Sequence, residues 1–191
     1  MANSGLTERV KNGIVGAIRG TGEIVNAVTD TVSGSIVHAV KGTGAVGTAV
    51  TSSAADVARG VIQGTSEVGG DLGSAAKGAM VGVLRGTKEV GTTTLDAVST
   101  SARSVVKSTA EVGGDVANAA HKAVEGAIQG ARDIGMDASE AASAAATGAL
   151  KGAGEISRAA VEQVTSAVTG VIDGVKVVVR EPFKTSPPDA M

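Results

Sequence analysis

The chain has 191 residues, a mass of 18.4 kDa and a formal net charge of −2 at pH 7. It contains one Phe and no Trp, Tyr or Cys, whereas Gly, Ala and Val make up nearly half of the sequence. This composition excludes disulfides and cysteine-based metal sites, supplies no basic excess for binding nucleic acid, and lacks the bulky side chains of a conventional core.

The first segment, residues 1–14, is polar and carries Glu8 and Arg9 where a secretory signal would have an apolar core. Its apolar residues Leu6, Val10 and Ile14 already have helical spacing, so we interpret it as the lead-in to a helix. The sequence has no run of about 18 apolar residues, the length that a membrane span requires. We therefore expect a cytoplasmic protein, free or peripherally attached to a membrane, lipid droplet or storage granule.

Residues 15–179 form eight consecutive blocks that align without an insertion, and each full block consists of two 11-residue units. Apolar or small residues recur within each block at intervals of 4, 3, 4, 4, 3 and 4. This period of about 3.67 residues is that of an 11-residue helical repeat. Two columns of branched apolar residues are the candidate lipid- or partner-facing positions: Ile18, Ile24, Val40, Val46, Ile62, Val68, Leu84, Val90, Val106, Val112, Ile128, Ile134, Leu150 and Ile156.

A β-solenoid is the alternative to a helix, because Gly-, Val- and Thr-rich repeats of this length also suit strands. Two observations favour the helix: the spacing is not the strict alternation of a strand, and the segments 117–122 and 138–146 are rich in Ala and poor in β-branched residues. Cations on the polar face precede acids by four residues, as in Arg85 and Glu89, which predicts ion pairs within each helix.

Glycine is the anomaly of this pattern, because each Gly inside a helix costs about 0.8–1 kcal/mol relative to Ala. An isolated helix of this composition would be largely disordered in water, so another helix or a lipid surface must stabilise it. Small residues four apart let helix backbones approach closely. The Gly-x-x-x-Gly pattern that we assign to close packing occurs in six blocks, at Gly16, Gly20, Gly60, Gly64, Gly82, Gly86, Gly126, Gly130, Gly148, Gly152, Gly170 and Gly174.

The sequence thus predicts an all-α fold of long amphipathic helices, either extended or folded back as hairpins. Turns or kinks are expected at the Gly69–Gly70 and Gly113–Gly114 pairs. Residues 180–191 contain three prolines and are expected to form a disordered tail.

The repeat resembles the amphipathic 11-residue repeats of perilipins and synucleins, which are also rich in Gly, Val, Thr and Ala and nearly free of aromatics. Gly86-Thr87-Lys88-Glu89-Val90-Gly91 is similar to the Lys-Thr-Lys-Glu-Gly-Val unit of the synucleins. The resemblance spans about residues 15–179 and implies a chain that is disordered in solution and becomes helical on lipid droplets or vesicles.

Two functional hypotheses follow, neither of them enzymatic. The first is an amphipathic repeat protein that adsorbs to a lipid, membrane or storage-granule surface. The second is a structural protein that self-assembles into bundles or filaments through its glycine ridges. A more remote alternative is an ice-binding or stress-protective helix, suggested by the threonines that recur once per block from Thr21 to Thr109.

No catalytic, metal or cofactor site is expected. His38 and His121 are the only two histidines and lie far apart in the sequence, and the repeat spreads the acidic residues instead of clustering them. The predicted partner is therefore a lipid surface or a second copy of the chain, with no nucleic acid and no small-molecule substrate.

Overall fold

The computed structural model describes residues 2–21, 23–43, 47–92 and 95–179, and the predicted tail at 180–191 lies outside them. These residues form eight helices and one two-stranded sheet. The elements are α1 (Ala2–Thr21), α2 (Ile24–Thr43), α3 (Thr48–Glu67), α4 (Leu72–Glu89), α5 (Leu95–Glu111), α6 (Val116–Ile134), α7 (Ala138–Gly154), α8 (Arg158–Val168), β1 (Gly170–Ile172) and β2 (Val175–Val177).

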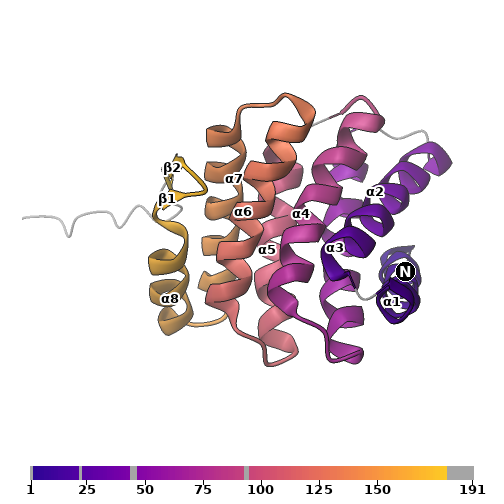
Figure 1. Cartoon of the computed structure of the whole chain (residues 1–191), viewed down its shortest axis with the longest axis horizontal. Coiled ribbons are helices and arrows are strands. Elements are labelled where there is room, and N and C mark those ends of the chain that lie inside the picture. Colours follow the sequence, from indigo (N-terminus) through magenta and orange to yellow (C-terminus); the bar gives the residue numbers. More distant parts are fainter. Residues whose placement is uncertain (1, 22, 44–46, 93–94, 180–191) are drawn as a thin grey trace, which may run out of the picture.

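The helices form two layers, because each helix packs most extensively against the helix two positions along the chain. The odd-numbered helices α1, α3, α5 and α7 form one layer, and α2, α4, α6 and α8 form the other. They stand side by side along the long axis of the molecule (Figure 1). The predicted all-α helical repeat is confirmed, whereas the long helices of 11-residue units are not, because no described helix is longer than 20 residues.

A glycine with positive φ marks each of five turns, and these glycines recur at one position of the repeat: Gly47, Gly69, Gly91, Gly113 and Gly135. After α3, Gly69 N–H donates to the Ser66 carbonyl at 3.0 Å and Gly70 N–H donates to the Thr65 carbonyl at 2.9 Å. This pairing is the Schellman motif that ends helices. The turns predicted at Gly69–Gly70 and Gly113–Gly114 are confirmed, whereas those at Gly91 and Gly135 are not among the predictions.

An aspartate two residues after the turn glycine begins three of the helices. The carboxylate of Asp71 accepts hydrogen bonds from the Ser74 N–H at 2.8 Å and the Gly73 N–H at 3.3 Å. Asp115 and Asp137 cap α6 and α7 in the same way. The hydrogen bonds from Ser74 hold the pKa of Asp71 below its ordinary value. Each of these repeats therefore carries its own signals for helix end and helix start.

The core is built almost entirely from Ala and Val side chains, and Ile, Leu84 and Met80 supply its largest members. It extends through both layers, from Val10 in α1 to Val168 at the end of α8. The stabilising surface that the glycine-rich helices require is thus supplied by other helices of the same chain. The α1 helix begins at Ala2, so residues 2–14 of the segment assigned as a lead-in, 1–14, lie in the first helix.

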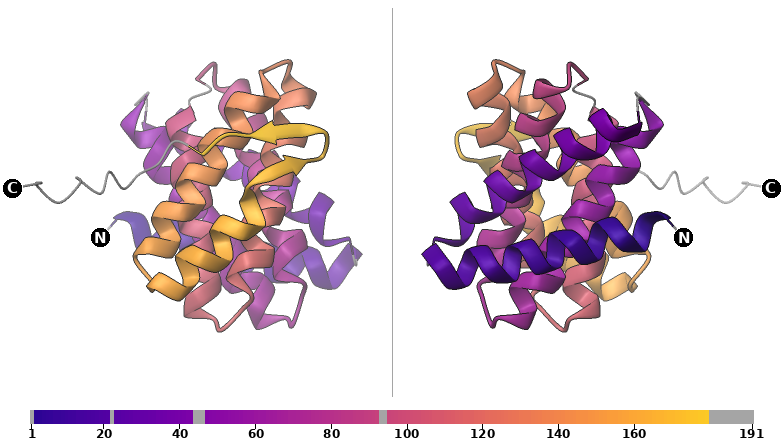
Figure 2. Two further views of the ribbon diagram at one scale, coloured as in Figure 1. Left: turned by 90° about the vertical axis from the view of Figure 1, so that its left-hand side faces the viewer. Right: turned by 90° about the vertical axis from the view of Figure 1, so that its right-hand side faces the viewer.

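The strands β1 and β2 depart from the all-α prediction. They pair antiparallel, with Gly170 opposite Val177 and Ile172 opposite Val175. Asp173 and Gly174 connect them with φ values of 48° and 77°, the left-handed conformation of a tight hairpin turn. Gly170 and Gly174 therefore lie in this hairpin and not on a helical ridge. Figure 2 shows α8 and the hairpin at one end of the molecule and α1 with α2 at the other.

Candidate functional site: the glycine ridges and an open end groove

The ridge glycines of α3 and α4 contact the backbone of the helix two positions earlier. A Cβ atom added at Gly60 would lie 2.7 Å from the Thr7 carbonyl oxygen of α1. Added at Gly78, it would lie 2.7 Å from the Val25 carbonyl oxygen of α2. Because real Cβ atoms do not approach an oxygen so closely, only glycine permits this packing distance. The remaining ridge positions of these two helices, which are similarly enclosed, are Gly64, Gly82 and Gly86.

The same arrangement continues toward the C-terminus. Gly126 faces the Lys77 carbonyl of α4, and Gly148 faces the Ser99 carbonyl of α5. Gly130 and Gly152 are enclosed by Leu84 and Arg103, respectively. In α5, serines take the place of the ridge glycines. Ser104 Oγ donates to the Ala55 carbonyl at 2.8 Å, whereas Ser108 Oγ is buried with no partner among the described residues.

Two of the ten glycines assigned to close packing in α1 to α7 differ from the rest. Gly16 in α1 is exposed, and a Cβ there would meet nothing within 4 Å. The surroundings of Gly20 lie outside what the structure describes. The difference at Gly16 has a simple cause: α1 is the first helix of its layer, so no preceding helix covers its ridge.

The apolar columns are used mainly inside the molecule. The first column is buried at Ile62, Leu84, Val106, Ile128 and Leu150. Two partly buried positions, Val68 and Val90, directly follow α3 and α4. The other partly buried positions pack against the core: Ile18, Ile24, Val40, Val112 and Ile134. Ile156 is 39% exposed, and Val46 lies outside the described residues. In this conformation the columns do not form a continuous lipid-facing surface.

Most ion pairs of the described residues join two helices, and none of those found is a pair four residues apart, such as Arg85 with Glu89; Lys11 with Glu8 and Lys122 with Glu125 pair within one helix, three residues apart. Arg85 Nη2 lies 2.7 Å from Asp133 Oδ2, a residue 48 positions later in the next helix of the layer. Lys107 Nζ lies 2.6 Å from Glu155 Oε2 with the same separation. The hydrogen bond from Lys107, aided by the charge of Arg103, lowers the pKa of Glu155.

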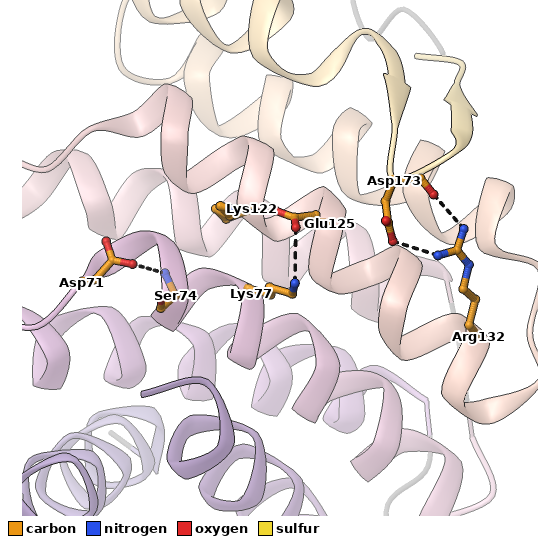
Figure 3. A network of polar contacts seen from close by, with 7 residues as sticks. All are labelled: Asp71, Ser74, Lys77, Lys122, Glu125, Arg132 and Asp173. Atoms are coloured by element: carbon orange, nitrogen blue, oxygen red, sulfur yellow. Dashed lines mark hydrogen bonds and ion pairs between the residues drawn. The ribbon is translucent and has the colours of Figure 1, made fainter. Parts of the chain in front are cut away.

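Two further contacts of this kind connect α6 to α4 and to the hairpin (Figure 3). Lys77 Nζ lies 3.3 Å from Glu125 Oε1, and Lys122 approaches the same carboxylate within α6. Arg132 donates to both the side chain and the carbonyl of Asp173, each at 2.8 Å, and so fastens the hairpin turn to α6.

A groove of about 750 Å³ opens between α1, α2 and α3 at the N-terminal end. Its lining, which sequence reasoning did not identify, includes Leu6, Arg9, Val10, Asp30, Gly34, His38, Gly42 and Asp56. Burial raises the pKa of the half-buried Asp56 carboxyl, and the charge of Arg59 opposes this shift. The local sequence sign of the groove is His38, which stands where the repeat two blocks later has Gly82.

Neither histidine belongs to a metal site in the described part of the chain. His38 lines the groove, whereas His121 Nδ1 lies 2.8 Å from the Ala167 carbonyl, to which it donates when that nitrogen is protonated. Across the described ranges, no three His, Cys, Asp or Glu side chains are placed to hold a metal ion. No described helix is both long and apolar enough to cross a bilayer.

Comparison with known proteins supports the fold but supplies no activity. No protein-family model and no curated protein matches the sequence. Among solved structures, the crystal structure of the de novo designed helical repeat protein DHR7 matches with a TM-score of 0.53 and 19% identity, covering 86% of this chain and 91% of that one. The fold therefore places the chain in the class of helical-repeat proteins.

Proposed function

We propose that this chain is a non-enzymatic structural protein that self-assembles by packing helices on glycine ridges. The observation that carries this proposal is the contrast between covered and uncovered ridges. Glycines in α3, α4, α6 and α7 are closed by a neighbouring helix, whereas Gly16, Gly34 and Gly42 meet nothing within 4 Å. Terminal repeats of a solenoid need a polar outer face for solubility, whereas the N-terminal end of this molecule has a groove lined by the uncovered glycines Gly34 and Gly42.

The close approach seen inside the chain supports such an interface. Glycines permit backbone contact between helices, and many weak contacts then replace the large side chains that this sequence lacks. The cost of glycine in each helix is offset only when the ridge is covered. An uncovered ridge at α1 and α2 therefore retains a cost that association with another helix would offset.

Adsorption to a lipid surface is the second candidate, favoured by the amphipathic 11-residue repeat and by a core of small side chains. It requires the two layers to open, because the residues that would face lipid, such as Ile62, Leu84 and Ile128, are fully buried. In that proposal the cytoplasmic chain would exchange contacts between its helices for contacts with the membrane or granule.

Sedimentation velocity over a range of concentrations, repeated with lipid vesicles and a flotation assay, tests these proposals. Self-assembly predicts a mass that rises with concentration in lipid-free buffer, with the helix content unchanged. Adsorption predicts a monomer in buffer that floats with the vesicles. A chain that remains monomeric in buffer contradicts the self-assembly proposal.

A further inference from the structure

We propose that the groove between α1, α2 and α3 is the contact surface of a two-fold symmetric dimer, in which each copy places its N-terminal helices against those of the other. This inference rests on the proposed self-assembly and specifies the surface, the partner and the symmetry. It predicts a closed dimer and not a growing filament.

The groove continues the series of interfaces that runs through the molecule. Gly78 and Gly86 occupy the positions equivalent to Gly34 and Gly42 two blocks later, which is one full two-layer repeat. At Gly78 an added Cβ would lie 2.7 Å from the Val25 carbonyl oxygen, because α2 covers that ridge. Gly34 and Gly42 line the groove, and an added Cβ would meet nothing within 4 Å at either position. The missing neighbour is a helix.

The C-terminal end of another copy does not present the missing helix. The α8 helix turns Ala160, Val164 and Val168 inward, where all three are buried. Its exposed positions are mostly polar, namely Arg158, Ala159, Glu162, Gln163, Thr165 and Ser166. The hairpin closes the same end and is held by the Arg132–Asp173 contacts. A head-to-tail arrangement would thus place the polar face of α8 over an apolar groove wall, since the most exposed apolar side chains at that end, Val171 and Val178, belong to β1 and to the residue after β2 and not to α8.

His38 further disfavours a head-to-tail continuation. It occupies the position equivalent to Gly82, where an added Cβ would lie 2.6 Å from the Val32 Cβ. An imidazole at that position prevents a helix from docking with the spacing used inside the chain. A helix of the partner must therefore pack on α2 with a different geometry from that used inside the chain, as a helix related by a two-fold axis does.

The groove carries charges of both signs, and besides the half-buried Asp56 they include one cation and one anion that face it from different helices. Arg9 lines it from α1, and Asp30 lines it from α2. In the proposed dimer α1 of each copy lies opposite α2 of the other, so the two-fold axis brings Arg9 of one copy to Asp30 of the other at two places in the interface. Such repetition is a property of isologous contacts, which close at two subunits.

The test compares the full chain with two matched variants by sedimentation velocity and by light scattering after size exclusion. Gly34→Leu fills the groove, whereas Ala159→Leu adds an apolar side chain at an exposed position of α8, at the closed end. We expect the unmodified chain and Ala159→Leu to form dimers at micromolar concentration, and Gly34→Leu to be monomeric. Circular dichroism of Gly34→Leu should show unchanged helix content, because its Cβ meets nothing within 4 Å.

The other possible outcomes distinguish a failure of the proposed dimer interface from a failure of the proposed self-assembly. If the chain assembles and Gly34→Leu assembles equally well, the groove is not the interface, although self-assembly stands. If both variants lose assembly, or if the mass of the unmodified chain grows beyond a dimer, the contact is head-to-tail and the two-fold arrangement is wrong. A monomeric unmodified chain would overturn both proposals.

Discussion

Replacing Gly78 with alanine measures how much the fold depends on backbone contact between helices. In an open helix this change stabilises by about 1 kcal/mol, because Ala has the higher helix propensity. At Gly78 the added Cβ would lie 2.7 Å from the Val25 carbonyl oxygen and 3.0 Å from the Val28 Cβ. Overpacking typically costs about 1–3 kcal/mol. Because a backbone oxygen moves only with its helix, we expect a cost near the upper value and a net loss of about 2 kcal/mol.

The assay is urea denaturation and thermal unfolding followed by circular dichroism, with Gly16→Ala as the control. Gly16 lies in α1, where an added Cβ meets nothing within 4 Å, so this variant should be more stable by about 1 kcal/mol. For a chain of this length each kcal/mol shifts Tm by about 2–4 °C. Gly78→Ala should therefore melt about 4–8 °C lower, and Gly16→Ala about 2–4 °C higher. Equal stabilisation by both variants would refute the close-packing argument.

Three further predictions concern single side chains. Gly113→Ala should lower the free energy of unfolding by about 1 kcal/mol in urea titrations, because φ is +73° there and L residues are strained in that region; an unchanged value would contradict the assigned turn. Ser108→Ala should raise Tm by a few degrees in thermal melts, because its buried hydroxyl has no partner among the described residues; a lower Tm would indicate that the hydroxyl is bonded. Lys107 lowers the pKa of Glu155, so the stability that this ion pair contributes is present above the unfolded Glu pKa of about 4.3 and is lost as the pH falls through the lower pKa of the folded state. Glu155→Gln should therefore reduce the loss of stability between neutral and acid pH, measured by urea titrations at several pH values. An unchanged loss would exclude this ion pair as a cause.

The helical repeat could be predicted from sequence because spacing reports directly on secondary structure. The column that contains Ile62 and Leu84 recurs without an insertion, and the structure buries both residues in helices. The turns are harder to identify. A block of two 11-residue units equals about six helical turns, so the apolar spacing stays in phase across every loop and resembles one continuous helix. The column from Gly47 to Gly135 is the signal that distinguishes the two, since its residues mark the turns.

The pairing of helices could not be predicted, because all repeats carry nearly the same pattern. Nothing in the columns distinguishes packing against the next helix from packing against the one after it. The choice depends on close contacts such as that of Gly60 with Thr7, and on ion pairs such as Arg85 with Asp133. The hairpin, in contrast, had a readable signal: Asp173–Gly174 between β-branched residues is a typical tight-turn sequence.

The groove at α1, α2 and α3 follows from an end effect that no periodic pattern contains. Gly34 and Gly42 belong to a ridge similar to that of Gly78 and Gly86, and only their place in the first helix of a layer leaves them uncovered. His38 is the local sign that this end differs, because it stands where the later repeat has Gly82.

The central claim is that the chain folds into a two-layer repeat stabilised by its own helices. Hydrogen exchange of the backbone amides in lipid-free buffer tests this claim most directly. We predict strong protection in α4 and α6, whose glycine ridges are covered, and weaker protection in α1, the first helix of its layer. Rapid exchange throughout these helices, slowed only after lipid vesicles are added, would contradict it and would favour a chain that folds on a membrane.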